Sequence, residues 1–382
     1  VATATRVVIL LDAVDQFEPT PVARHLTWLP DPWPENVRLI ATGRPGTATE
    51  ALSGLSGMET RELAPLRREE AREIVRQVCR RYHRTVHEAV VTTLLDRRLS
   101  SGEMAAGNPL WLQLATEALL LLDQDDFARL GAFTGTAEEK LHALLLTTAG
   151  GFPPRVEALY ATLLERTEDA YGEAWAREFA NLLAVSRRGL READLRAVLP
   201  QRTGDPWDEL TFATLRRGFR GHLVQRGAAG EWDVTHAQLR QTILGRNLSA
   251  PADQRAVHAA LADHLLGLPG NDPLHRDETM VHLIGADDRQ RAAAYYGGTI
   301  STDERDGATR ALAAHLLERS GQDPNPGVAW ATDLLDVDRH GPPIVEHLCR
   351  RYTAHLSAAV RNDLPVAQQI ALMLTVERTL EE

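Results

Sequence analysis

The chain has 382 residues, of which 43% are hydrophobic and 25% charged, and its formal net charge at pH 7 is -11. This length suits two or three domains of a soluble globular protein. The negative charge argues against polyanion binding over a broad surface, because phosphate contacts need clustered cations. No apolar run approaches the ~18 residues that span a bilayer, and no signal peptide opens the chain.

The two cysteines, Cys79 and Cys349, are far apart, and each lies on the apolar face of a helix-like segment. Their number excludes a disulfide framework, and no metal-binding spacing is present. We expect both to be core thiols, because free cysteine packs as a small hydrophobic residue. This use of cysteine fits a reducing, cytoplasmic location.

The first predicted elements form an α/β pattern. Residues 6–11 and 37–42 are continuous apolar runs rich in β-branched residues, which predict buried parallel strands. A helix is expected between them at residues 22–29, and a third short strand near residues 58–63. Strand, helix and strand in this order are typical of a parallel sheet.

After Pro65 the pattern becomes helical. Apolar residues recur at helical spacing from Ala71 to Tyr82. Further helices are expected at residues 86–95 and 109–122, so this part of the chain is predicted to be all-helical.

A compact unit follows a predicted linker at residues 150–154. Its expected elements are three helices at residues 155–166, 172–185 and 191–198, and a hairpin of two strands at residues 221–226 and 232–235. Helices followed by a two-stranded hairpin describe a winged helix. From Pro251 to Glu382 only helices are expected.

Two acidic residues follow the first predicted strand: Asp12 ends it, and Asp15 comes three residues later. A carboxylate at the tip of a buried strand suits a magnesium–phosphate site, because the sheet fixes its position and its charge offsets the metal. The second acid is placed to orient or deprotonate an attacking water. An ordinary strand end with a capping aspartate has the same pattern, so this pair alone does not decide between the two.

The second predicted strand is followed by Thr42-Gly43-Arg44-Pro45. A guanidinium group binds phosphate through two parallel hydrogen bonds. Arg44 therefore suits a sensor of the γ-phosphate, although a solvent-facing arginine in a turn would give the same sequence.

These two segments, VVILLDAVDQFEP and VRLIATGRP, resemble the Walker B and sensor 1 segments of STAND-class P-loop NTPases, particularly the NACHT-like branch. Later segments resemble the family in the correct order: the start of the lid, the lid motif, the start of the winged helix and the winged-helix histidine motif, at residues 63–66, 107–112, 183–199 and 234–240. The resemblance covers roughly residues 5–295.

The resemblance implies a remnant of an α/β nucleotide-binding domain with a parallel sheet, followed by mostly α structure. The implied domains are the C-terminal part of the P-loop NTPase domain, a helical lid, a winged-helix domain and a helical, possibly repeat-like domain, at residues 1–63, 64–150, 151–250 and 251–382.

The resemblance also implies roles for five residues, with ATP or ADP and Mg²⁺ as cofactors. Asp12 would hold Mg²⁺ through water, and Asp15 would be the catalytic or water-orienting acid. Arg44 would sense the γ-phosphate, and Pro109 would pack on the adenine. His236 would reach the β-phosphate of ADP, for which an imidazole N–H is chemically suited. A polar histidine at a hairpin-to-helix junction and a first-turn proline are the alternatives for the last two.

Two departures from the family pattern stand out. Gln16 occupies a position where many NACHT members carry an acid, so hydrolysis is expected to be slow or to depend on Asp15 alone. The chain also lacks the G-x-x-x-x-G-K-[ST] loop, because its only lysine, Lys140, has no such glycine frame. We expect that loop to lie upstream of Val1 in a longer protein, and this chain alone to bind nucleotide poorly.

The function implied by the resemblance is a nucleotide-dependent switch in bacterial, including antiviral, defence or cell-death signalling. ADP would hold a closed monomer; an unknown trigger would admit ATP, and self-association would activate an effector. A STAND-type transcription regulator is one alternative, although Glu192 and Asp194 in the winged helix argue against nucleic acid as a partner. A helical scaffold with a degenerate ATPase remnant is the other. No membrane segment is expected.

Overall fold

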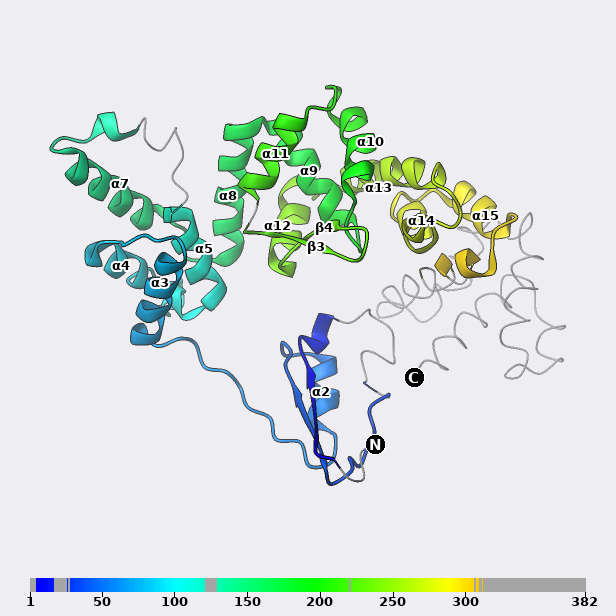
Figure 1. Ribbon diagram of the computed structural model, residues 1–382, viewed down its shortest axis with the longest axis horizontal. Helices are drawn as coiled ribbons and strands as arrows, with labels where there is room; N and C mark the ends of the chain where they lie inside the picture. Colours follow the sequence, from blue (N-terminus) through cyan, green and yellow to red (C-terminus); the bar gives the residue numbers. More distant parts are fainter. Residues whose placement is uncertain are drawn as a thin grey trace. The chain divides into compact units, whose positions relative to one another are not determined.

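A computed structural model describes residues 5–16, 26, 28–120, 129–219, 221–305, 307–308 and 311, and Figure 1 shows its elements. The chain divides into two compact units, one of Val1–Arg61 with Gln254–Glu382 and one of Glu62–Asp253. The described part is predominantly helical with one small parallel sheet, which confirms the expectation of a mostly α, multi-domain chain.

A two-stranded parallel sheet opens the first unit. Strand β1 (Val7–Leu11) pairs with β2 (Val37–Ala41), and the register places Leu11 opposite Ala41. Both strands lie where the apolar, β-branched runs predict them. Because the strands are parallel, their carboxyl ends lie at the same edge of the sheet.

The two faces of this sheet differ in burial. One face packs on a small core whose buried members are Val14, Leu26, Leu29, Ala48 and Leu52. On the other face Val8, Leu10 and Ile40 are 54%, 71% and 56% exposed. The prediction of buried strands is therefore wrong for one face within the described structure, because the described residues supply apolar packing partners to the other face alone. Parallel sheets are ordinarily covered on both.

Helix α2 (Thr47–Ser53), which the apolar pattern did not predict, follows β2 and supplies two residues to this core. The predicted strand near residues 58–63 is also wrong. This segment is extended but pairs with no described strand, and Leu63 is 91% exposed. An extended segment becomes a strand only where a partner satisfies its backbone groups. Most of the helix predicted at residues 22–29 lies outside the described residues.

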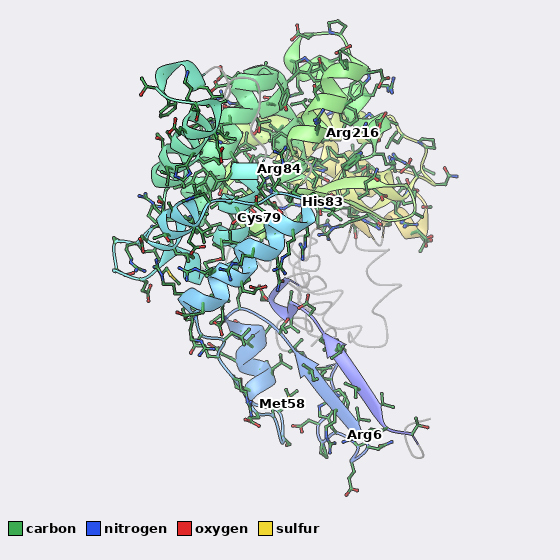
Figure 2. The ribbon with its side chains drawn as sticks, turned by 60° about the vertical axis from the view of Figure 1, so that its left-hand side comes forward. Arg6, Met58, Cys79, His83, Arg84 and Arg216 are labelled. Carbon is green, nitrogen blue, oxygen red and sulfur yellow. The ribbon has the colours of Figure 1, made fainter. Side chains whose placement is uncertain are left out.

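Among the described residues, the first part of the second unit contains the helices α3 (Arg68–Arg81), α4 (Glu88–Leu95), α5 (Pro109–Leu120) and α7 (Ala137–Gly151). Trp111, Leu112 and Leu94 are fully buried among them. Cys79 lies on α3 (Figure 2) and is buried, which confirms it as a core thiol. Burial raises the pKa of this thiol, so it is poorly reactive. Cys349 lies outside the described residues.

The second part has the helix–hairpin–helix order of the predicted winged helix. Its elements are α8 (Val156–Tyr171), α9 (Glu173–Val185), α10 (Glu192–Thr203), α11 (Glu209–Gly218), β3 (Leu223–Arg226), β4 (Glu231–Val234) and α12 (Ala237–Asn247). Strands β3 and β4 are antiparallel. Leu190 and Trp232 exchange both backbone hydrogen bonds, so the segment before α10 pairs with β4. The hairpin is confirmed, whereas α11 was not predicted.

Helices α13 (Pro251–Leu266), α14 (Pro273–Gly285) and α15 (Arg289–Gly297) follow, as the helical pattern after Pro251 predicts. The rest of the predicted helical region, residues 312–382, lies outside the described residues. No helix in the described ranges is both long and apolar enough to cross a membrane.

Gly189, in the part of the second unit that is predicted to be a winged helix, lies close against the backbone of β4. Its φ is +85°, and an added Cβ would lie 2.5 Å from the carbonyl oxygen of Trp232. Gly204 has a similar φ of +81° but no atom within 4 Å of the added Cβ. We expect Gly204→Ala to cost about 1 kcal/mol of left-handed strain. Gly189→Ala should cost several times more, because β4 must also move.

Urea unfolding, followed by circular dichroism, measures the free energy of unfolding of each variant against the wild type. Equal destabilisation by the two substitutions would contradict the close packing of Gly189 on β4.

Candidate functional site

The ends of β1 and β2 are joined by a network of hydrogen bonds. The amide of Thr42 donates to the Leu11 carbonyl at 2.9 Å, and the Val14 amide donates to the Thr42 carbonyl at 2.9 Å. The Thr42 hydroxyl accepts from the Ala13 amide at 2.9 Å and donates to Oδ1 of Asp12. Thr42 therefore holds the strand-end carboxylate in place, a role that sequence reasoning missed.

Asp15 and Arg44 form a second pair at the same edge. Asp15 lies in a short 3-10 helix, η1 (Val14–Gln16). Arg44 donates from Nε to Oδ2 at 2.7 Å and from its backbone amide to Oδ1 at 3.0 Å. The structure thus brings together two residues that the sequence places in separate motifs.

The ionisation of Asp15 follows from this contact. Burial of the carboxyl opposes ionisation, but the hydrogen bonds and charge of Arg44 outweigh it and hold the pKa of Asp15 below its ordinary value. Both carboxylate oxygens are engaged by Arg44, and the Asp15 side chain is only 16% exposed. An acid held ionised in this way can orient a water better than it can take a proton from it.

Local backbone features place these side chains. Ala13 has a φ of 53°, in the left-handed region, and turns the chain from β1 into η1. A Cβ added to Gly43 would lie 2.7 Å from Cγ2 of Thr49 and 2.9 Å from Cγ2 of Val14. Only glycine fits between Thr42 and Arg44 at this packing distance.

The fit of a magnesium ion can be judged from Asp12. Its Oδ1 accepts from Thr42, while Oδ2 accepts no hydrogen bond from a described residue, and the side chain is exposed. Mg²⁺ typically keeps several waters and uses one or two carboxylates with phosphate oxygens. Asp12 fits that manner of binding. No group of three or more His, Cys, Asp or Glu residues in the described ranges forms a metal site by itself.

Pro109 begins α5 in the second unit and is exposed. Oδ1 of Asn108 caps the helix by accepting from the amides of Leu110 and Trp111 at 2.9 and 3.2 Å. The amide of Leu66 donates to the Gly107 carbonyl at 2.9 Å. The two lid motifs that resemble the family therefore touch each other, and Pro109 sits as a first-turn proline.

His236 immediately precedes α12 and is half-buried. Its ring caps no backbone amide and bonds to no other side chain that the structure describes. Burial lowers its pKa, so the imidazole is neutral at pH 7. A neutral ring keeps one N–H that can donate to a ligand oxygen.

Arg240 fixes the segment that carries His236. It donates from Nη2 to Oδ1 of the buried Asp233 at 2.6 Å, and from Nη1 to three carbonyls at the end of α9, those of Leu183, Ala184 and Ser186. A cation at helix carbonyls and a buried carboxylate is strongly held. Sequence reasoning gave neither Asp233 nor Arg240 a role.

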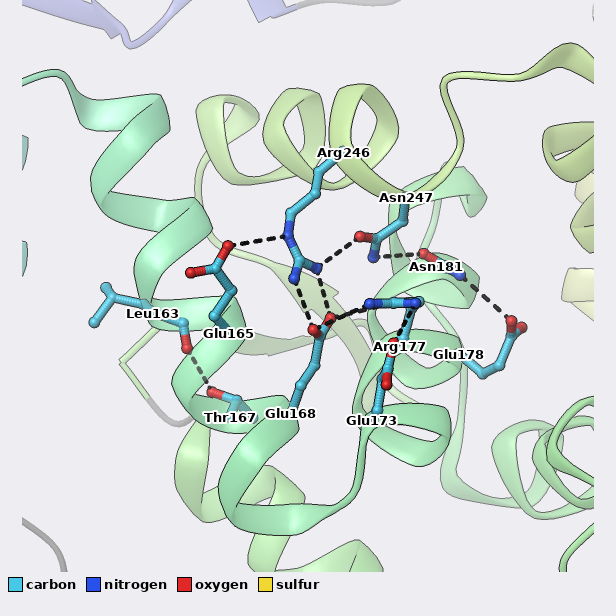
Figure 3. Close-up of polar contacts among 10 residues, drawn as sticks. All are labelled: Leu163, Glu165, Thr167, Glu168, Glu173, Arg177, Glu178, Asn181, Arg246 and Asn247. Atoms are coloured by element: carbon cyan, nitrogen blue, oxygen red, sulfur yellow. Dashed lines mark hydrogen bonds and ion pairs between the residues drawn. The ribbon is translucent and has the colours of Figure 1, made fainter. Parts of the chain in front are cut away.

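The other end of α12 is fixed by Glu168 of α8, which is 7% exposed. Arg246 donates to its two oxygens at 2.6 and 2.7 Å, and Arg177 of α9 lies 3.3 Å away (Figure 3). Burial opposes ionisation, but the two arginines hold the pKa of Glu168 below its ordinary value. The contact binds three helices through one carboxylate.

The predicted site residues therefore fall into two groups. Asp12, Asp15 and Arg44 gather at the strand ends of the first unit, whereas Pro109 and His236 belong to the second unit.

Comparisons with known proteins give a distant and partial similarity. No family model and no solved structure matches the chain. It is 27% identical to NACHT domain- and WD repeat-containing protein 1 of Homo sapiens, over 68% of this chain and 16% of that protein. It is 23% identical to a TPR repeat-containing protein of Dictyostelium discoideum, over 54% of this chain and 11% of that protein. The chain thus spans less than a fifth of either relative.

Removing the Glu168 carboxylate should strongly destabilise the packing of α8, α9 and α12 in the second unit. Glu168→Ala leaves Arg246, whose side chain is only 21% exposed, without its buried counter-ion, which costs about 3–5 kcal/mol. Glu173→Ala is the matched control, because Glu173 pairs with Arg177 but is 66% exposed, and such pairs contribute about 0–1 kcal/mol. Chemical unfolding measures both; similar losses would refute the central role of Glu168.

The Asp15–Arg44 contact should depend on pH. Since the folded-state pKa of Asp15 lies below the ordinary 3.8, the contact stabilises the fold fully above that value. The stabilisation is lost as pH falls through the lower folded-state pKa. In Arg44→Gln the pKa of Asp15 should rise, because burial remains and the cation is gone.

Carboxyl-carbon NMR titration measures this pKa. Arg38→Gln is the control, because the Arg38 guanidinium donates only to backbone carbonyls among the described residues. An Asp15 pKa that is the same in wild type and Arg44→Gln would contradict the contact.

Proposed function

We propose that the chain is the nucleotide-responsive part of a STAND-class, NACHT-like signalling switch that changes conformation between ADP and ATP. The observation that carries this proposal is the pairing of Asp12 with Thr42 and of Asp15 with Arg44 at the carboxyl ends of two parallel strands. Ligands of α/β sheets bind at such ends. The partial similarity to a NACHT domain-containing protein supports the same class.

In this proposal Asp12, Arg44 and Asp15 have different roles at the strand ends. Bound Mg²⁺ would neutralise phosphate charge, and Asp12 would hold it through water from the oxygen that Thr42 leaves free. Arg44 would leave Asp15 when a γ-phosphate is present, because its guanidinium is 52% exposed and its Nη groups bond to no described residue. Asp15, once released, would orient a water.

The second unit would report which nucleotide is bound. Pro109, exposed at the first turn of α5, would pack against the base. His236, neutral and free of side-chain partners in the described structure, would donate to the diphosphate of ADP. The networks of Arg240 and Glu168 would transmit that contact, because they tie α12 to α8 and α9. Self-association and effector activation belong to this proposal by family likeness alone.

The alternative of a DNA-binding regulator is disfavoured by the ion pairs of α10. Arg191 pairs with Asp194 at 2.8 Å, and Arg196 pairs with Glu209 at 2.6 Å. Arginines that are neutralised within the protein supply little attraction for phosphate. A scaffold without nucleotide has no specific observation in its favour.

Arg44 provides the direct test of the proposed switch. The complete gene product is titrated with fluorescent ATPγS and fluorescent ADP. Arg44→Gln should weaken ATPγS binding about tenfold, since a charge-assisted pair contributes about 1.5–3 kcal/mol, and should leave ADP binding unchanged. Arg38→Gln serves as the control. Equal losses for both nucleotides, or no loss, would exclude Arg44 as a γ-phosphate sensor.

His236, in contrast to Arg44, should affect the binding of ADP. In the complete gene product, His236→Ala should release bound ADP about tenfold faster, because one hydrogen bond to a charged group is lost. Gln241→Ala is the control, since Gln241 is exposed on the same helix. Stopped-flow displacement of fluorescent ADP measures the rate, and unchanged release would remove His236 from the site.

A further inference from the structure

A pocket of about 390 Å³ lies within the second unit. Its walls come from the C-terminal half of α5, from α8, and from the end of α11 with the residues after it. Apolar and aromatic side chains form much of its lining: Leu114, Tyr160, Leu163, Tyr171, Phe219 and Leu239. This size and lining are typical of small-molecule sites.

Two residues of this lining each carry a buried polar atom that has no hydrogen-bond partner among the described residues. The two atoms are Oη of Tyr160, a side chain that is 1% exposed, and Nδ1 of His222. The two rings meet edge to face, with centroids 5.6 Å apart. Buried polar atoms are nearly always bonded. Both atoms are shielded from solvent, so a ligand bonds to them when the two rings turn toward the pocket, and it then supplies the interactions that the protein leaves unmade.

Both rings are uncharged at pH 7. Burial lowers the pKa of His222 to about 4, and His236 nearby adds to the effect. Burial also raises the pKa of Tyr160, and the charge of Glu117 contributes. The interior of the pocket therefore offers neutral donors and acceptors, which suit a hydroxyl group or a ring nitrogen.

The lining of the pocket also carries positive charge. Arg166 is half-buried and Arg217 is exposed, and neither forms a hydrogen bond or ion pair with a residue in the described ranges. The one acid in the lining is Glu117, which accepts from Gln113 at 3.1 Å. Two arginines against one carboxylate favour an anionic group beside the arginines, and guanidinium binds carboxylate through two parallel hydrogen bonds.

From these observations we infer that the pocket binds a small aromatic carboxylate with a ring hydroxyl or ring nitrogen. Its carboxylate pairs with Arg166 and Arg217, its ring packs against Tyr171 and Phe219, and its polar ring atom bonds to Tyr160 or His222. Such a ligand touches both α5 and α8, so it strengthens their packing. This inference does not depend on the proposed nucleotide switch, because none of the proposed nucleotide contacts lines the pocket.

The test uses the full chain and ligand-observed NMR with three probes: 4-hydroxybenzoate, nicotinate and indole-3-acetate. At least one should bind saturably below about 1 mM, and its neutral amide should bind about tenfold more weakly. AMP, which carries a phosphate in place of a carboxylate, is the comparison ligand. Binding of AMP with no binding of any carboxylate would overturn the inference, as would no saturable binding at all to folded protein.

Variants locate the site. Arg166→Gln and Arg217→Gln should each weaken the bound carboxylate about tenfold, whereas Arg155→Gln should not, since Arg155 pairs with Glu157 outside the pocket. Binding that survives both pocket substitutions would place the ligand elsewhere and overturn the assignment.

Tyr160→Phe separates a ligand site from a structural role. Without ligand, this variant should melt at the wild-type temperature or above, because the hydroxyl has no partner to lose. With ligand, its binding should weaken. A lower melting temperature together with unchanged ligand binding would show that the hydroxyl is satisfied within the fold, and would contradict the inference.

Discussion

Parallel pairing of β1 with β2 is the constraint on which the candidate nucleotide site depends. The register that puts Leu11 opposite Ala41 also puts Asp12 beside Thr42, and the turn at Ala13 brings Asp15 to Arg44. A slip of one residue would turn alternate side chains to the opposite face and separate both pairs. The strand-end chemistry is therefore a consequence of backbone pairing, with Gly43 giving the close packing that lets the two ends meet.

In the second unit, the position of α12 depends on two buried ion pairs. Glu168 and Asp233 are almost fully buried carboxylates, and each is matched by an arginine of α12. Buried ion pairs contribute little net stability but cost much when one partner is lost. Their effect is to fix α12, and hence His236, in one orientation against α8 and α9. The predicted winged-helix unit is therefore fastened near both ends of α12.

The sequence allowed prediction of elements whose signals are local. Continuous apolar runs located both strands, and the glycine-rich turn between two short strands located the hairpin. Motif order placed Asp12 and Arg44 at neighbouring strand ends, because parallel strands share an edge. Helix α2, only seven residues long and without an apolar stripe of its own, carried no such signal.

Contacts between residues that are far apart in the sequence could not be predicted from local patterns. The Asp15–Arg44 contact joins residues 29 positions apart, and the Arg246–Glu168 contact joins residues 78 apart. The exposure of Val8, Leu10 and Ile40 depends on what covers the sheet and not on the strand itself. The lack of hydrogen-bond partners at Oη of Tyr160 and Nδ1 of His222 likewise depends on how distant segments pack together, so no local sequence pattern indicates it.

The measurement that tests the central claim most directly is the nucleotide content of the complete gene product after purification. The protein is denatured, and the released small molecules are separated by chromatography and quantified against protein. If the chain is part of a nucleotide switch, we expect ADP or ATP at close to one per protomer, and loss of that nucleotide in Asp12→Asn. No released nucleotide, and none taken up when ATP and Mg²⁺ are added to the folded protein, would contradict the account and make the strand-end pairs purely structural.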